Sequence, residues 1–384
     1  MRVPILRLPY SATEIADITA AIAEVLQSGY LTMGSKVKAF EEAFARFAGT
    51  PWAVAVNSGT SALEMILRAL DVRGKTVVVP TVTFMATPFA AIHAGARVVF
   101  VDVRTQDLSI DPVDLERKLG PDTAAVVAVH IGGVISGQFD EIERLCAQRA
   151  VPLVEDAAHA HGSMWRGRRA GSLGIAAAFS FYPTKILTTA EGGMITTLDE
   201  SLLRQALTLR EHGKPDHRYN VHTEVGSNWR FSEIHAVLGL LQMAKADALI
   251  AERRRLAAMY DEALRGVHGI RPLAIPASVF CAYYKYIAFL DDGIDRNRVK
   301  QTLRDEYEVS LAGEVYAEPC HSQPVFDRYP EYRVNAPTEG FPGAEYVCSR
   351  QICLPLYPGL SDDELLYTVE SLQTVLKSGS RSRC

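Results

Sequence analysis

Apolar residues recur at helical spacing near the start of the chain. Residues 11–14 read Ser-Ala-Thr-Glu, a capping-box pattern, and isoleucine or leucine follows at positions 15, 18, 22 and 26. The pattern predicts a helix that Gly29 ends. A second helix is expected from about Ser35, because a further set of apolar side chains shares one helical face: Val37, Phe40, Phe44 and Phe47.

Between residues 52 and 154, short runs rich in Val and Ala alternate with helical patterns. Strands are expected at residues 52–56, 76–79, 96–101, 124–129 and 151–154. Helices are expected between them, at residues 61–70, 84–93, 113–119 and 142–148. Continuous apolar strands separated by helices predict an α/β fold with a mostly parallel sheet covered on both faces.

The rhythm changes in the second half of the chain. Helices are expected at 199–212 and 230–264, and the charged run at 252–255 is interpreted as a solvated helix face. A strand at 282–290 and helices at 296–307 and 362–376 predict a smaller α+β domain. The expected division is an arm at 1–10, a large domain at 11–249, a small domain at 250–377 and a disordered tail at 378–384.

Composition narrows the function classes. A hydrophobic fraction of 48% with a net charge of −5 is typical of a soluble globular protein and argues against nucleic acid as a partner. Six scattered cysteines without a C-x-x-C pair predict neither a metal site nor a disulfide framework, and reduced thiols fit a cytoplasmic location. No apolar run is long enough to predict a membrane span, and the first ten residues do not resemble a signal peptide.

Two loops that follow expected strands carry polar residues suited to a ligand. Residues 57–63 form a small-residue turn that leads into a helix, which offers N–H groups to a phosphate. The alternative is that Ser58 or Thr60 merely caps that helix. After the strand at 151–154, Asp156 comes just before two histidines, His159 and His161; the alternative there is a helix N-cap with solvated histidines.

A third loop presents one lysine. Residues 179–185 begin as an apolar run, break at Pro183 and present Lys185, and a second apolar run follows through residues 192–197. A solvated turn lysine is the alternative to a reactive amine. However, an N–H turn, a carboxylate and an amine are the three anchors that pyridoxal 5′-phosphate (PLP) requires for its phosphate, pyridine nitrogen and aldehyde.

From residue 54 to about 241 the chain resembles the DegT/DnrJ/StrS-type aminotransferases, PLP enzymes with the aspartate aminotransferase fold that aminate keto sugars and cyclitols. Several ordered segments carry the resemblance. They are residues 57–63, 80–84, 155–162, 171–174, 179–185, 191–193 and 226–233. This resemblance implies fold-type I, with a sheet of the seven-stranded type between helices.

The resemblance also implies roles for individual residues. Lys185 would be the Schiff-base lysine and Asp156 the partner of the pyridine nitrogen, while Phe84, taken alone a core residue, would stack on the ring. The phosphate would be bound by Gly59, Thr60 and Ser180, and by Asn228 of the neighbouring subunit in a homodimer. His159 stands where glutamine is commonest and would donate to the phenolic oxygen. Substrate contacts are expected less directly: Arg230 for a donor carboxylate, with a structural ion pair as the alternative, and His321 for the sugar.

The expected reaction moves an amino group from glutamate or glutamine to a nucleotide-linked keto sugar or a keto cyclitol, with pyridoxamine 5′-phosphate (PMP) as the intermediate cofactor form. Amino-sugar, antibiotic or surface-glycan biosynthesis would be its setting. Lysine at 185 disfavours sugar 3-dehydration, since family members with that activity carry histidine there. Two alternatives stay open: another PLP reaction, such as elimination or dehydration-aromatisation, and a non-catalytic regulatory protein that kept the fold.

Overall fold

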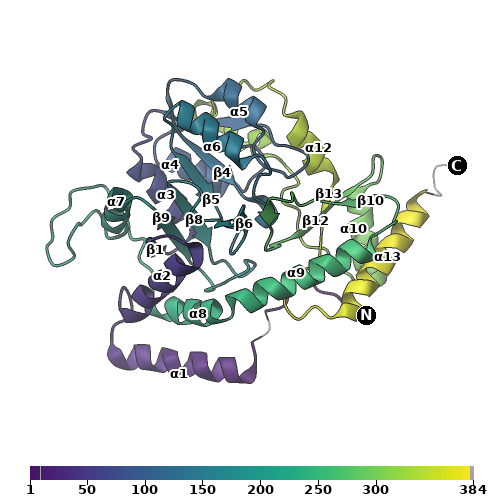
Figure 1. The fold of residues 1–384 in the computed structure, drawn as a ribbon, viewed down its shortest axis with the longest axis horizontal. Coiled ribbons are helices and arrows are strands. Elements are labelled where there is room, and N and C mark those ends of the chain that lie inside the picture. Colours follow the sequence, from purple (N-terminus) through teal and green to yellow (C-terminus); the bar gives the residue numbers. More distant parts are fainter. Residues whose placement is uncertain (9, 381–384) are drawn as a thin grey trace.

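A seven-stranded sheet forms the centre of the computed structural model, which describes residues 1–8 and 10–380 (Figure 1). Across the sheet the strands are β1 (Trp52–Val56), β9 (Gly193–Thr197), β8 (Ala176–Ser180), β5 (Leu153–Asp156), β4 (Thr123–Val129), β2 (Thr76–Pro80) and β3 (Arg97–Val101). Only β9 is antiparallel to its neighbours in this sheet. The predicted mostly parallel α/β sheet is therefore confirmed.

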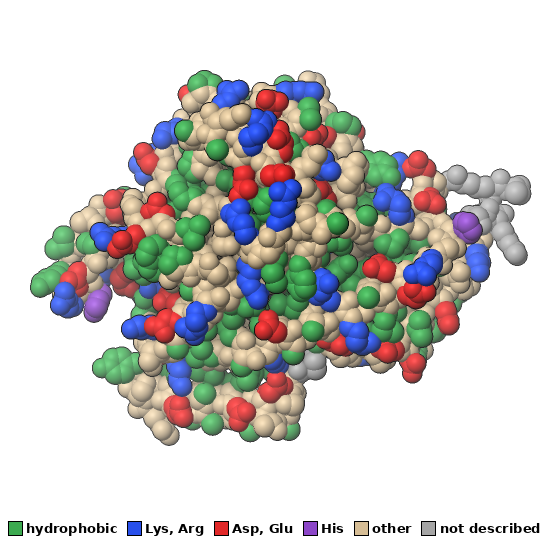
Figure 2. Space-filling view, viewed as in Figure 1, with side chains coloured by type: hydrophobic (Ala, Val, Ile, Leu, Met, Phe, Trp, Pro, Cys, Tyr) green, Lys and Arg blue, Asp and Glu red, His purple; other side chains and the backbone are tan. Residues whose placement is uncertain are grey.

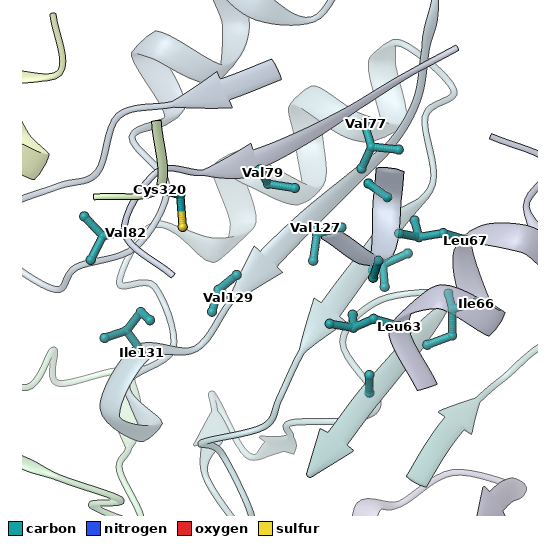
Figure 3. Close-up of a cluster of buried hydrophobic side chains, with 14 of the residues drawn as sticks. Leu63, Ile66, Leu67, Val77, Val79, Val82, Val127, Val129, Ile131 and Cys320 are labelled. Atoms are coloured by element: carbon teal, nitrogen blue, oxygen red, sulfur yellow. The ribbon is translucent and has the colours of Figure 1, made fainter. Parts of the chain in front are cut away.

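Helices cover both faces of this sheet, and each face has its own hydrophobic core. One face packs against α3 (Gly59–Ala69), α4 (Ala86–His93) and α7 (Glu200–Arg210). The other packs against α2 (Ser35–Ala48), α5 (Pro112–Lys118), α6 (Phe139–Gln148) and α8 (Glu233–Ala244). Figure 3 shows Leu63, Ile66 and Leu67 of α3 beside Val77 and Val127. Since successive strand residues point to opposite faces, the Val-rich strands supply both cores.

The predicted first helix is present, but its apolar residues do not all face the core. α1 (Ala12–Ser28) has the capping box at Ser11 and Glu14, and Gly29 ends it with φ of 73°. In this chain Ile15 and Leu26 are 54% and 57% exposed, and Val25 alone in α1 is fully buried. Ile18 and Ile22 are half-buried, so only part of the predicted apolar side packs on the rest of the described chain, and Ile15 and Leu26 near its ends stay exposed.

The C-terminal part packs around a third core. It contains α9 (Ala246–Ala263), β10 (Ile270–Pro272), β12 (Tyr286–Leu290), β13 (Gln351–Leu354), α10 (Arg296–Tyr307) and α13 (Asp362–Ser380). The helix predicted at 230–264 is instead two helices, α8 and α9, which meet at 59° near Lys245. The bend lets Ile250 pack on the large core while Tyr260 packs on the small one, so the predicted boundary at 249/250 falls inside α9.

Shorter elements complete the described chain. They are β6 (Met164–Trp165), β7 (Arg168–Arg169), β11 (Val279–Phe280), α11 (Val325–Arg328), α12 (Pro342–Arg350), η1 (Ile131–Gly133), η2 (Cys320–Ser322) and η3 (Pro330–Tyr332). Helix α13 continues to Ser380, so the start of the predicted tail is helical; residues 381–384 lie outside the described residues. No single helix of the described chain is long and apolar enough to cross a membrane; α8 and α9 meet that test only as a bent pair.

The charged run at 252–255 is not a uniformly solvated face. Arg253 is 2% exposed, and its Nη1 donates to the backbone oxygens of Tyr283, Tyr284 and Leu356. The prediction was wrong at this position because α9 passes between the two cores. There, a guanidinium satisfies carbonyl groups that the ends of β12 and β13 leave without strand partners.

A segment of the C-terminal part closes the edge of the large sheet. The amide side chain of Asn335 pairs with β3 like a strand: its Oδ1 accepts from Phe100 N at 2.6 Å and its Nδ2 donates to Phe100 O at 3.0 Å. Close by, Asp102 accepts from the N–H groups of Gly343 and Ala344 at the start of α12. These contacts attach the segment to an edge strand that would otherwise expose unpaired groups.

Replacing Asn335 by alanine is therefore expected to lower the free energy of unfolding by about 1–3 kcal/mol. The change would leave the buried N–H of Phe100 without a partner, at a cost of about 1–3 kcal/mol, while the Phe100 carbonyl would still accept from Lys118 Nζ at 2.8 Å. Urea unfolding measures the effect, with the exposed Asn297→Ala as the matched control. A cost no larger than that of the control would show that the Asn335 contacts contribute nothing.

Candidate active site

A pocket of about 490 Å³ lies where the parallel strands end. The segments after β1, β2, β4, β5 and β8 line it, and Tyr284 and Tyr316 reach it from the C-terminal part. Ligands of open α/β sheets bind at this carboxyl edge. The pocket thus gathers the three loops that the sequence indicated.

The turn after β1 forms a cradle at the start of α3. Ser58 caps the helix, its Oγ accepting from Ser61 N at 3.1 Å, so the capping expectation is confirmed. A Cβ on Gly59 would lie 2.9 Å from Ser180 Cβ and 3.2 Å from Phe179 O, so only glycine lets the turn approach β8 this closely. The first N–H groups of α3 have no acceptor within the helix, and Thr60 lines the pocket beside them.

Asp156 ends β5 and faces the pocket. It is 7% exposed and accepts hydrogen bonds from Thr87 Oγ1 at 2.7 Å and from Ala158 N at 3.2 Å. No helix starts here, so the alternative of a helix N-cap is wrong. Its neighbour Glu155 points elsewhere and bonds to His130 and to the N–H groups of residues 171, 173 and 174. Glu155 thereby fixes the end of the strand that carries Asp156.

Lys185 is partly buried in the turn after β8. Its backbone N–H donates to the backbone oxygen of Tyr182 at 2.9 Å, and its side-chain Nζ lies 4.8 Å from the centre of the Tyr284 ring. Burial lowers the pKa of Lys185 to about 8; the charge of Asp156 opposes this shift and that of Lys285 adds to it. The alternative of a solvated turn lysine is therefore wrong. Near neutral pH, Lys185 is a free amine far more often than an ordinary lysine, and a free amine is the nucleophilic form.

Aromatic rings form the remaining walls. His159 is 5% exposed, stacks on Tyr284 at 4.1 Å, and its Nδ1 accepts from Gly132 N at 3.3 Å in the tautomer assigned to it. Burial, with the charges of Lys185 and Lys285, lowers the pKa of His159, so its ring is neutral and not a solvated cation. Phe84 is 61% exposed and lies 5.8 Å from Tyr316, so the expectation of a core residue at Phe84 is wrong.

The sequence did not single out three residues that shape this pocket. Thr87 bonds to Asp156, Tyr284 lies between Lys185 and His159, and Tyr316 stands between Phe84 and His159. Thr87 and Tyr284 lie in segments whose sequence pattern predicted a secondary structure: a helix at 84–93 and a strand at 282–290. Nothing in the residues around Tyr316 signalled its position.

Three predicted site residues lie outside the described lining of this pocket. Asn228 is exposed in the segment that joins α7 to α8. Arg230 pairs with Glu211 at 2.9 Å, which is the structural ion pair named as the alternative. His321 Nδ1 lies 2.6 Å from Thr81 Oγ1, and its ring packs on Phe341 at 4.2 Å.

His161 lies in an aromatic cage formed by Phe44, Phe179 and Phe181. It is fully buried, and neither ring nitrogen has a hydrogen-bond partner among the described residues. Burial, with the charges of Lys185 and Arg253, lowers the pKa of His161 to about 3. The expectation of a solvated histidine is wrong for His161 as well.

This histidine makes stability depend on pH. Between about pH 6.5 and pH 3 the unfolded chain protonates His161 while the folded chain does not, so stability is expected to fall as the pH falls through that range. His161→Leu should reduce the slope of unfolding free energy against pH, as measured by urea unfolding from pH 7 to pH 4. The exposed His268→Leu is the control, and equal slopes for both variants would contradict the assignment.

Comparison with known proteins finds a match to one protein family. The chain matches the model of the DegT/DnrJ/EryC1/StrS aminotransferase family over residues 12–373. It is 35% identical to the spore coat polysaccharide biosynthesis protein SpsC of Bacillus subtilis (strain 168), over 96% of this chain and 97% of that protein. The expected resemblance is therefore confirmed over nearly the whole chain.

Solved structures agree with this match. DesV of S. venezuelae, solved with a ketimine intermediate, has a TM-score of 0.90 at 31% identity and covers 98% of this chain and 99% of its own. DesI, solved with its TDP-sugar product, has a TM-score of 0.86 at 28% identity and covers 96% of this chain and 93% of its own. Another structural relative has been solved in PLP and PMP forms.

Proposed function

Because the chain belongs to the DegT/DnrJ/EryC1/StrS aminotransferase family of PLP-dependent enzymes, we propose that it transfers an amino group from glutamate or glutamine to a keto sugar or keto cyclitol. The observation that carries the proposal is the meeting of an amine, a carboxylate and a helix N-terminus in one pocket. Amino-sugar, surface-glycan or secondary-metabolite biosynthesis is the setting that fits this reaction.

The residues present fit the cofactor. The N–H groups of the Gly59 cradle and the hydroxyls of Thr60 and Ser180 line the same pocket, and such a group of donors supports phosphate binding there. Asp156 is a buried acceptor held by Thr87, as a protonated pyridine nitrogen requires. We assign the aldehyde to the Lys185 amine, the phenolic oxygen to His159 and the stacking position to Phe84. When bound, PLP supplies an electron sink for the carbon from which a proton is removed.

In this scheme, side chains of the protein itself carry out the proton transfer from the amino donor. With a pKa of about 8, the Lys185 amine accepts a proton from the donor's α-carbon and returns it without a large energetic penalty in either direction. The neutral His159 ring adds no competing charge next to that amine. Tyr284 and Tyr316 exclude water from the walls around Lys185.

The mouth of the pocket suits an acceptor that carries a second bulky group besides its reacting ring. Phe84 and Tyr182 line it and are 61% and 49% exposed, so they offer flat apolar surfaces to a sugar or a base. DesI was solved with a TDP-sugar, and SpsC is named for polysaccharide synthesis. These observations support a nucleotide-linked keto sugar over a free cyclitol.

A homodimer with shared sites is part of the proposal. Ile15 and Leu26 of α1 and the nearby Tyr30 and Leu31 are exposed and apolar. The segment between α7 and α8 projects from the body of the molecule (Figure 1), and Figure 2 shows apolar side chains exposed on it. We assign these surfaces to a partner copy, into whose pocket Asn228 would reach from the base of that segment.

Replacing Lys185 by alanine is expected to abolish transamination, with a loss of at least about a thousandfold in kcat/KM, because no other amine lines the described pocket. The visible absorbance of bound PLP should shift to that of the free aldehyde. Stopped-flow spectroscopy and an amino-donor assay measure both, and Lys377→Ala in α13 is the control. Unchanged absorbance and activity would overturn the assignment.

The rival reaction class has its own test. An aminotransferase is expected to convert its PLP to PMP with glutamate or glutamine alone, whereas an eliminase or dehydratase does not need an amino donor. Formation of PMP can be followed spectroscopically, and a panel of free and nucleotide-linked keto sugars and keto cyclitols then shows which acceptor restores PLP. If no donor produced PMP, the transaminase proposal would fail.

Mixing two inactive variants tests the shared site. Lys185→Ala and Asn228→Ala dimers, once subunits have exchanged, should recover about a quarter of wild-type activity, because half of the dimers are mixed and each has one intact site. Activity before and after exchange, with each variant alone as the control, measures this. If Asn228 acted within its own subunit, no activity would return on mixing.

A further inference from the structure

Lys185 also lines a second, smaller cavity that differs in character from the active-site pocket. The volume of this cavity is about 30 Å³, which is enough for one or two molecules or ions of the size of water. The N-terminal arm forms one wall through Arg7 and Tyr10. The segment that carries Lys185 and residues of α8 and α9 form the others, so the arm closes a space next to the reactive amine.

The walls of this cavity are strongly cationic. Arg7, Lys185, Lys245 and Arg253 line it, and no carboxylate does among its described lining residues. Two of these charges are compensated from outside, Arg7 by Glu364 at 2.5 Å and Lys245 by Glu14 at 2.5 Å. The charge of Asp156 acts on Lys185 from the active-site side, so Arg253 is the cation of this wall that has no carboxylate partner in the described chain.

The same walls are rich in donors and poor in acceptors. Arg253 is 2% exposed, its Nη1 donates only to backbone oxygens, and its Nε has no partner among the described residues. Gln242 Nε2 donates to Tyr10 Oη at 3.5 Å, and the Tyr10 hydroxyl proton has no acceptor in the described part. Buried donors and unpaired charges are costly unless something accepts from them.

We propose that this cavity binds one small monovalent anion of the size of chloride, held by Arg253, Tyr10 and Gln242 next to Lys185. A water molecule would fill the space and accept two hydrogen bonds, but it would leave the charge of Arg253 unbalanced. The anion stabilises the protonated form of Lys185 and thus lowers the fraction of reactive amine. Halide concentration and the docking of the N-terminal arm thereby both act on Lys185.

Two measurements on the full-length protein freed of cofactor test the site without any activity assay. The melting temperature is followed while sodium chloride replaces sodium gluconate at constant ionic strength, and crystals are soaked in bromide for anomalous scattering. We expect a saturable rise of about 2 °C with chloride and a bromide peak between Tyr10 and Arg253. The proposal would be overturned if the melting temperature did not change when chloride replaced gluconate, or if no bromide peak appeared in the cavity.

Variants distinguish chloride binding in this cavity from a general effect of salt on the melting temperature. Tyr10→Phe and Gln242→Leu remove donors from the wall and keep the cationic residues, so the chloride-dependent rise should at least halve in each and vanish in the double variant. Gln148→Leu, on an exposed position of α6, is the matched control and should keep the full rise. An equal rise in all four variants would show that chloride acts elsewhere.

Discussion

The burial of the Lys185 amine beside Asp156 is the constraint on which the rest of the site depends. Desolvation pushes the amine toward its neutral form, while the carboxylate keeps part of it charged, and the balance brings its pKa to about 8. Both groups need fixed positions for that balance to hold. Thr87 and the β5 strand hold Asp156, and the turn bond from Lys185 N to Tyr182 O holds the lysine segment.

The C-terminal part has to stay docked for this environment to persist. Tyr284 and Tyr316 come from it, and without them Lys185 and His159 would be solvated. Asn335 helps attach it to the large sheet by completing the edge of β3, and within the C-terminal part Arg253 ties α9 to the start of β12. Both side chains are buried and bond to backbone groups, so their loss exposes donors and acceptors as well as removing contacts.

Local pattern was enough to predict much of this arrangement. The helix at 296–307 and the strand at 52–56 match the structure residue for residue, because a clear period and strong caps or turns bound each of them. The loops after the parallel strands could be expected to converge, since their carboxyl ends share an edge. Lys185 and Asp156 were predicted for that reason, together with the family resemblance.

Other features depend on tertiary contacts that no local pattern encodes. Arg253 belongs to a charged run that reads as a solvated face, and it is buried only because α9 crosses between two cores. Phe84 follows a buried strand and reads as core, yet the loop turns it out to the pocket mouth. Tyr316 lies in an irregular segment and packs against Phe84 and His159, which come 232 and 157 positions earlier in the chain, so distant packing decides its role.

The charges around the pocket bear on how a phosphate would be held there. Among its described lining residues the charged groups are Lys185, Asp156 and Glu191, so the pocket is already slightly anionic before a phosphate enters. The N–H groups at the start of α3 and the nearby hydroxyls balance part of a phosphate dianion, since a helix N-terminus carries roughly half a positive charge. In the proposed dimer, Asn228 of a partner copy would add one more hydrogen-bond donor to that phosphate, and because an amide is neutral it would leave the charge balance unchanged.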